Sequence, residues 1–288
     1  MSRKPTKSTS LVPVGRRKPP ARRKATTPAV ISATADALLP ILGSSLAVAK
    51  LVGTGGEVAR EGDVTLVTGR DYATREMVVP ADEIYYDGDA TPAGDGPWLG
   101  EADKVSWRDQ ASGYDCIMLR DTSRGFLSGY VGLPRDHPLW GWECEAVPSD
   151  LGIDVHGGLT YSAICQDGPS PQRRIVTEAQ RICHSPHRLL GHIPFKHATD
   201  HRVANDDAWW LGFSCDHAYD LSPGDLRPGA GFMKAEVGAS YRDDGYVARE
   251  TTALAAQLLA IANDGTAPGR DGPPPPPIGL DPDKGGRA

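Results

Sequence analysis

Hydrophobic and polar positions predict several short strands through the middle of the chain. The candidate segments are rich in aromatic and β-branched residues and are bounded by Gly, Pro or Asp, as strands commonly are. They are Cys116–Leu119, Phe126–Val131, Ile153–His156 continued through Leu159–Ala163, and Trp209–Phe213.

One long helix is predicted near the end of the chain. Apolar side chains recur at helical spacing from Tyr246 to Ile261, Asp243 or Asp244 can cap the start, and Gly265 can end the helix. Strands followed by a terminal helix favour the α+β class over alternating βαβ units. We therefore expect an α+β fold of short mixed or antiparallel strands with a C-terminal packing helix.

The front of the chain gives weaker patterns. Residues 32–50 predict a short helix pair interrupted at Pro40. Apolar alternation and a Gly-containing turn at Thr68–Asp71 predict a hairpin over Asp63–Pro80. The Gly- and Asp-rich run at residues 87–96 predicts a linker.

Composition divides the chain into four parts. Residues 1–28 hold nine Lys/Arg and no acidic residue, and they lack apolar anchors, so we expect a disordered basic arm. Residues 29–96 form a small front segment with the hairpin and linker, and residues 97–262 form the main α+β domain. Residues 263–288 are rich in Pro and Gly and predict a disordered, polyproline-type tail. Subtracting the nine positive charges of the arm from the net −6 leaves −15 on the rest of the chain.

The sequence favours a cytoplasmic protein without a membrane segment, in the host cytoplasm if a phage encodes it. No stretch approaches the roughly 18 apolar residues that span a bilayer, because the best candidate, Ala29–Val52, is broken by Asp36, Pro40 and Lys50. No secretory signal pattern follows the basic start. An odd number of irregularly spaced cysteines indicates reduced thiols. The cysteines are Cys116, Cys144, Cys165, Cys183 and Cys215.

Two short motifs each place a pair of ligand-type side chains one residue apart. Asp154 and His156 form the first pair, and Cys215 and His217 form the second. Positions i and i+2 of an extended strand face the same side, so each pair could converge. Together they make an Asp/His/Cys/His set suited to zinc or another divalent metal. Asp220 could add a fifth ligand, orient a ligand, or act as a general base.

The same residues allow other interpretations. Cys215 could be a nucleophile with His156 as its base, and the backbone N–H groups of Gly157 and Gly158 could form an oxyanion hole. The glycine pair also fits close approach to a bound cofactor or a tight bend between strands. The plain alternative is that Cys215 is a buried structural thiol and that both histidines are satisfied core residues.

Other familiar templates find no support in the sequence. The chain contains no Walker loop, no GxGxxG, no HExxH and no GxSxG. Six Cys and His residues fall between residues 183 and 201, but their spacing matches no zinc-finger pattern. The paired tryptophans Trp209 and Trp210 favour core packing over a platform for nucleic-acid bases.

Several motifs between residues 107 and 259 form a specific combination. They are Gly113–Cys116, Gly129–Pro134, His137–Leu139, Asp154–Ser162, Ile182–His184, Trp209–His217, Tyr241–Asp243 and Tyr246–Val247. With these motifs the chain resembles an uncharacterised protein family met mostly in tailed bacteriophages, prophages and actinobacteria. The resemblance implies a phage or actinobacterial accessory protein and transfers no activity.

Three functional hypotheses follow. The first is a small metal-assisted hydrolase or nucleotide-modifying enzyme with catalytic His156, Cys215 and Asp220. The second is a non-catalytic binding protein that sequesters a nucleotide-like small molecule or a host protein. The third is an accessory protein that binds nucleic acid through residues 3–24 by displacing counterions. The arm could equally be a solvated tail that docks loosely on the acidic body.

Overall fold

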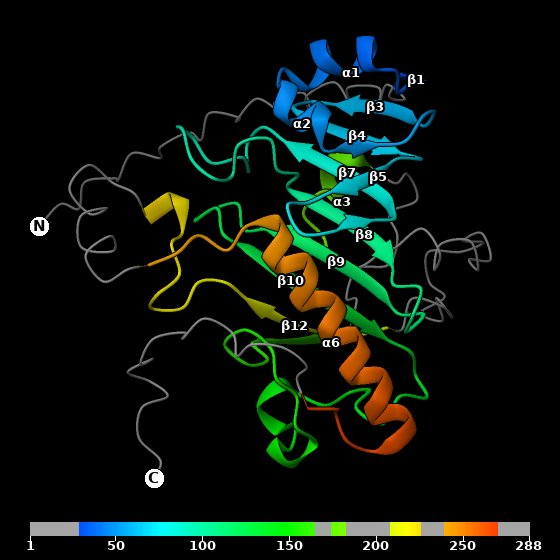
Figure 1. Cartoon of the computed structure of the whole chain (residues 1–288), viewed down its shortest axis with the longest axis vertical. Helices are drawn as coiled ribbons and strands as arrows, with labels where there is room; N and C mark the ends of the chain where they lie inside the picture. Colours follow the sequence, from blue (N-terminus) through cyan, green and yellow to red (C-terminus); the bar gives the residue numbers. More distant parts are fainter. Residues whose placement is uncertain (1–28, 165–173, 183–207, 226–238, 270–288) are drawn as a thin grey trace, which may run out of the picture.

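The computed structural model of the chain describes residues 29–164, 174–182, 208–225 and 239–269 (Figure 1). A nine-stranded antiparallel sheet dominates these residues. The predicted arm at residues 1–28 and the tail beyond residue 269 lie outside the described residues. The strands, in spatial order, are β1 (Val30–Ser32), β3 (Glu57–Glu61), β4 (Val64–Thr68), β7 (Ala81–Asp87), β8 (Lys104–Arg108), β9 (Asp115–Arg120), β10 (Leu127–Leu133), β12 (Trp209–Ser214) and β11 (Tyr161–Ile164).

Shorter elements surround the large sheet. A small antiparallel sheet joins β2 (Leu51–Val52), β5 (Asp71–Ala73) and β6 (Val78–Val79). The helices are α1 (Ala35–Leu42), α2 (Ser45–Ala49), α3 (Ile175–Glu178) and α6 (Asp244–Asp264), and short 3-10 turns cover Cys144–Ala146, Ser149–Leu151 and Pro223–Asp225.

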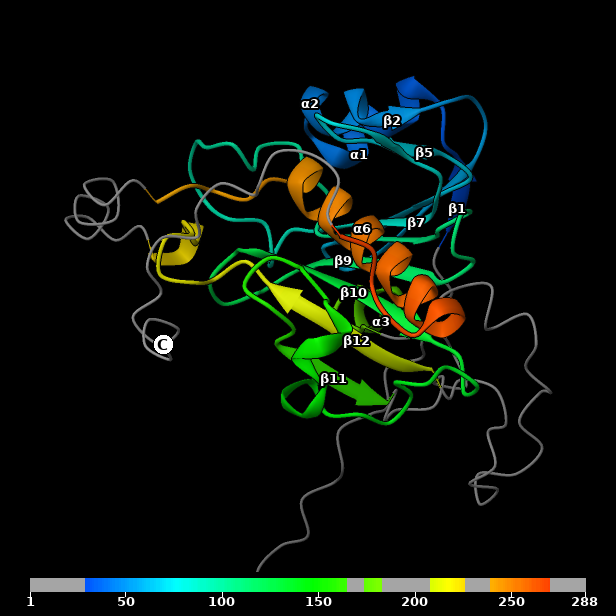
Figure 2. The ribbon, with the colours of Figure 1, turned by 60° about the horizontal axis from the view of Figure 1, so that its bottom comes forward.

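The large sheet carries different layers on its two faces. Along β8, Val105 and Trp107 join the main core that α6 completes, whereas the Lys104 ammonium reaches the other face and donates to the Glu178 carbonyl 2.6 Å away. This alternation follows from the two-residue period of a strand. Helix α6 lies across β9 and β10, and α3 packs on β3 and β4 (Figures 1 and 2).

A glycine in β10 allows α6 to lie close to the sheet. A Cβ atom on Gly129 would lie 2.1 Å from the Thr251 hydroxyl oxygen and 2.6 Å from the Phe213 ring. Atoms cannot approach that closely without displacement, so this position requires glycine.

The structure confirms an α+β fold with a C-terminal helix. Helix α6 begins after Asp243, whose carboxylate accepts the Tyr246 N–H at 3.0 Å, and ends before Gly265 in the left-handed region at φ 82°. Both signals were visible in the sequence as a capping residue and a terminal glycine.

Two predicted strand arrangements are wrong. The hairpin expected over Asp63–Pro80 does not form, because β4 pairs with β3 and β7 while β5 pairs with β6 in the small sheet. The segment Ile153–His156 is a loop, and β11 begins only at Tyr161. Gly157 and Gly158 turn this loop, with φ values of 67° and 83°.

The front segment and the main domain share one sheet. Strand β7 pairs with β8, so the sheet continues past residues 87–96, where we placed a boundary. The expected helix pair is α1 and α2, but Pro40 lies within α1 and the break follows at Gly43, with φ 64°. Among the described residues, no helix is long and apolar enough to cross a bilayer.

Candidate functional site

His156 lies at a buried junction of three segments. Its Nε2 is 2.7 Å from Asp220 Oδ2, and its Nδ1 is 2.8 Å from the Tyr246 hydroxyl oxygen in the first turn of α6. The His156 and Asp220 side chains have no exposed surface. Since an ionised carboxylate can only accept, Nε2 donates to Asp220. Both ring nitrogens are therefore engaged inside the protein.

Both carboxylate oxygens of Asp220 accept hydrogen bonds. Its Oδ1 accepts from Arg242 Nε at 2.8 Å, and Oδ2 also accepts the His217 backbone N–H at 3.0 Å. Burial alone would raise the pKa of this carboxyl, but the hydrogen bonds and charges of His156 and Arg242 outweigh burial and lower the pKa below 3.8. Asp220 is consequently ionised at neutral pH and anchors the junction.

Gly157 permits a close approach, but the approaching group is His217. A Cβ atom on Gly157 would lie 1.7 Å from His217 Nε2, and the His156 and His217 ring centroids are 5.3 Å apart. The packing of the His217 imidazole against the turn thus explains the glycine at position 157 without the predicted cofactor or oxyanion role of Gly157 and Gly158.

Cys215 has the surroundings of a buried structural thiol. Only 1% of the residue is exposed, and it belongs to the main core together with Phe213 and Val247. Burial is the main cause that raises the thiol pKa well above 9.0, and the nearby Asp220 carboxylate raises it further. A thiol with a raised pKa is a poor nucleophile, because the thiolate is the reactive form.

Asp154 differs from its expected partners. It is exposed, whereas His156 is buried, because the segment is a loop in which the two-residue period of a strand does not apply. Its backbone N–H and C=O exchange hydrogen bonds of 2.7 and 2.9 Å with the Gln257 side chain of α6. Of the predicted set, His156 and Cys215 are therefore buried, His217 is half-buried and Asp154 is exposed.

Within the described ranges, no group of three or more His, Cys, Asp or Glu residues is arranged to hold a metal ion. Zinc or another divalent metal at Asp154, His156, Cys215 and His217 stays a prediction. What the geometry does provide is a closed polar junction that fastens two loops to α6.

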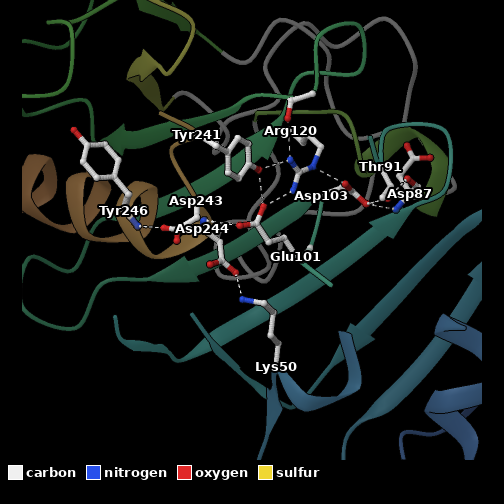
Figure 3. A network of polar contacts seen from close by, with 12 residues as sticks. Lys50, Asp87, Thr91, Glu101, Asp103, Arg120, Tyr241, Asp243, Asp244 and Tyr246 are labelled. Carbon is white, nitrogen blue, oxygen red and sulfur yellow. Dashed lines mark hydrogen bonds and ion pairs between the residues drawn. The ribbon is translucent and has the colours of Figure 1, made fainter. Parts of the chain in front are cut away.

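A second buried polar cluster surrounds Arg120 at the end of β9 (Figure 3). The Arg120 guanidinium donates to Asp103 Oδ1 at 2.8 Å, to Glu101 Oε2 at 2.9 Å and to the Tyr241 hydroxyl at 2.8 Å. Its side chain has no exposed surface. Such a planar, multiply bonded guanidinium fixes its partners in position.

Glu101 connects this cluster to α6. Its Oε2 accepts from the Tyr241 hydroxyl at 2.6 Å, and its Oε1 accepts the Asp244 backbone N–H at 3.0 Å. The Asp244 carboxylate in turn accepts from the Tyr72 hydroxyl at 2.7 Å and pairs with Lys50. Burial raises the pKa of the Glu101 carboxyl, and Arg120 offsets this only in part.

An open cavity of about 370 Å³ adjoins Glu101. It lies where α1 and α2 meet β4, β7 and the segment that leads into β8. Its apolar wall is Ile41, Leu42 and Ala47, and its remaining lining is Ser44, Arg60, Asp63, Thr65, Tyr86, Gly88, Asp89, Thr91, Gly100 and Glu101.

Sequence reasoning missed the Arg120 cluster, although a signal was present. In β9, Arg120 shares its face with Cys116 and Met118, which belong to the main core. A charged residue on the core side of a strand requires a buried partner. Strand alternation alone could have marked Arg120 as the centre of a polar cluster.

Comparisons with protein-family models, curated proteins and solved structures find no match for this chain. The resemblance to phage and actinobacterial proteins accordingly stays an expectation.

Proposed function

We propose that the protein is a binding protein that holds a small polar ligand in the cavity beside Glu101. The observation that carries this proposal is an open cavity of ligand size, whose lining combines apolar side chains of α1 and α2 with polar residues and includes the buried Glu101. Pockets for small molecules usually enclose about 300–1,000 Å³ and combine apolar walls with a few placed polar groups. The 370 Å³ cavity, with its apolar wall and Glu101, fits that description.

The His156 junction supports binding over catalysis. A general acid or base must reach the proton that it transfers. His156 has both nitrogens engaged and no exposed surface, and Cys215 is a buried thiol with a raised pKa. We assign this junction the structural task of holding the N-terminal end of α6 in place.

A second hollow of about 460 Å³ makes a weaker candidate. Pro80, Asp82, Arg108, Asp109, Gln110 and Gly113 line it. Asp109 is its one buried lining residue among the described residues, and Pro80, Arg108 and Gln110 are exposed. The cavity beside Glu101 instead has three lining residues that are at most 4% exposed, namely Ala47, Thr65 and Glu101.

A blocked cavity tests the proposal. Gly88 lines the cavity, and a Cβ atom there would lie 3.6 Å from its nearest neighbours in Asp63, which is ordinary contact. Gly88→Phe should therefore fold and fill the cavity. Gly269→Phe is the matched control, because nothing lies within 4 Å of a Cβ at that glycine.

The measurement is thermal stabilisation of the full chain by nucleosides, sugars and amines. We expect at least one compound to raise the Tm of the natural chain and of Gly269→Phe, but not of Gly88→Phe. Stabilisation of all three proteins alike would place the binding site elsewhere. A panel that stabilises none of them would remove the support for a small-molecule site.

Metal analysis addresses the competing hypothesis of a metal-assisted enzyme. An enzyme using Asp154, His156, Cys215 and His217 should carry about one divalent ion per chain, lost in His156→Ala. A chain purified without chelator that holds one zinc ion in this way would contradict the structural role that we give to the junction.

A further inference from the structure

We infer that the ligand of the cavity is an organic cation, in which an amine or guanidinium group is attached to an apolar part. The inference depends on the proposed binding function and adds the chemical class of the ligand. In this arrangement the exposed Asp89 carboxylate receives the positive group, the buried Glu101 carboxylate adds its negative charge from inside the protein, and Ile41 and Leu42 contact the apolar part.

Several polar groups of the lining are already engaged inside the protein. Asp89 is exposed in this lining, and its carboxylate can only accept hydrogen bonds when it is ionised. The Tyr86 hydroxyl donates to the Ala47 carbonyl at 3.3 Å, and the Thr91 hydroxyl donates toward Asp103 Oδ2 at 2.9 Å. Two hydroxyl protons in the lining are thus already directed into the protein, and a ligand that brings its own donors fits best.

The charge of the lining also favours a cation. Three carboxylates, Asp63, Asp89 and Glu101, face one guanidinium, Arg60. Arg60 lies 3.6 Å from Asp63 Oδ1, and its Nε donates to the Gly62 carbonyl at 3.1 Å. A phosphate or carboxylate ligand would meet like charges, so the nucleotide-like ligand considered from the sequence fits poorly here.

Glu101 supplies a fixed negative charge beside the cavity. Arg120 and Tyr241 bind its Oε2, and the Asp244 N–H binds its Oε1, so the carboxylate does not need to be ordered on binding. Burial raises its pKa, and the neighbouring Asp244 carboxylate raises it further, despite the charge of Arg120. An arriving cation would offset part of this burial penalty.

The apolar wall of the cavity favours a ligand with an apolar part. Ile41 and Leu42 at the end of α1 and Ala47 in α2 give the lining its aliphatic side chains, and Tyr86 adds an aromatic ring. Aliphatic or aromatic carbon atoms gain free energy by leaving water there. A small inorganic cation would leave this wall unused.

The test compares two probes of one skeleton. Agmatine carries a guanidinium and an amine, and 4-guanidinobutanoate has a carboxylate in place of the aminomethyl group of agmatine. Isothermal titration of the full chain at low salt should show agmatine binding at least tenfold tighter than 4-guanidinobutanoate. Gly88→Phe should abolish agmatine binding, and Gly269→Phe should retain it.

A rim variant tests the charge directly. Asp89→Asn should weaken agmatine about two- to fivefold, as loss of an exposed ion pair does. Asp89 is exposed, and its backbone N–H, which donates to Asp87 Oδ1, is kept in this variant. Asp95→Asn, an exposed acid that does not line the cavity, is the matched control and should bind as the natural chain does.

The possible failures are distinguishable. Equal affinity for the two probes, or an unchanged affinity in Asp89→Asn, would overturn the cation. A neutral nucleoside or sugar that binds and is lost in Gly88→Phe, without agmatine binding, would overturn the cation and retain the binding function. Agmatine that binds Gly88→Phe as well as the natural chain would overturn both.

Discussion

Asp220 is a carboxylate without exposed surface, and donors reach both of its oxygens. His156, Arg242 and the His217 backbone supply these donors from two loops and the segment before α6. A buried charge is tolerated only when it is paired and hydrogen-bonded, and removing one partner leaves the others uncompensated. The stability of this end of the molecule should therefore depend strongly on this one residue.

We expect Asp220→Ala to lower the free energy of unfolding by about 3–5 kcal/mol, because Arg242 would stay buried without its carboxylate. Chemical denaturation of the full chain, followed by circular dichroism, measures this change. Asp216→Asn is the control, since Asp216 pairs with Arg124 and both side chains are about one third exposed. This control should change stability by less than about 1 kcal/mol. Equal effects of the two variants would contradict the anchoring role of Asp220.

The pH dependence of stability at Asp220 has a definite sign. Its pKa is lowered in the folded state, so the unfolded chain binds this proton more tightly. The stability it contributes is complete above its usual value of 3.8 and is lost as pH falls through the lower, folded pKa. Glu101 and Asp103 have raised pKa values and act in the opposite direction.

Comparison with Asp220→Asn isolates this contribution. Unfolding free energies of the natural chain and the variant should differ most near neutral pH and should converge as pH falls below about 3.8. Denaturant titrations at pH 7, 5 and 3 provide the measurement. A difference between the two proteins that stays constant over this range would show that Asp220 does not titrate as the structure implies.

The elements predicted well are those with local signals. The α6 sequence contains its own cap, its apolar spacing and its terminal glycine, and β9, β10 and β12 are short segments rich in apolar residues. The hairpin over Asp63–Pro80 failed because the choice between β3, β6 and β7 as partners of β4 depends on long-range packing. Asp154 and His156 do not share a face, as a strand would require, because the segment that holds them is a loop that ends in a turn at Gly157 and Gly158.

In the candidate site, too, the residues could be predicted from local signals, whereas their environment depends on long-range packing. His156, Cys215, His217 and Asp220 do come near one another, since the His156 ring lies beside His217 and binds Asp220, and Asp220 raises the pKa of the Cys215 thiol. The burial of His156, Cys215 and Asp220, and the contacts with Arg242 and Tyr246, depend on how α6 lies on the sheet. No local pattern encodes that placement, which also brings the Asp244 N–H to Glu101 in the cluster around Arg120.

The contact between α6 and β10 gives a prediction at the scale of elements. Gly129→Ala should lower the free energy of unfolding by about 1–3 kcal/mol, because its Cβ would overlap Thr251 and Phe213. Gly129→Ala combined with Thr251→Ala should recover part of this loss, since the atom at 2.1 Å is removed. Thermal unfolding of both variants and of Thr251→Ala alone forms a complete cycle. Strictly additive losses would contradict direct contact between α6 and this strand.

At the scale of the whole molecule, charge is separated along the chain. Nine positive charges fall within residues 1–28, while the remaining residues carry −15. Acidic side chains gather at the cavity, where Asp63, Asp89 and Glu101 outnumber Arg60. The body is thus poorly suited to a nucleic-acid backbone, and any affinity for nucleic acid should belong to the arm.

Deletion of residues 1–28 tests this separation of tasks. If the full chain binds duplex DNA, its affinity should fall steeply with salt, with a log–log slope no steeper than about −8 for nine neutralised phosphates. The deletion should abolish this binding while leaving thermal stability and agmatine binding unchanged, because the cavity is built from residues 41–101. Fluorescence anisotropy between 50 and 200 mM salt measures the slope, and deletion of residues 270–288 is the control for removal of a terminus. DNA binding that survives loss of the arm with the same slope would place the nucleic-acid surface on the folded body, against its net negative charge.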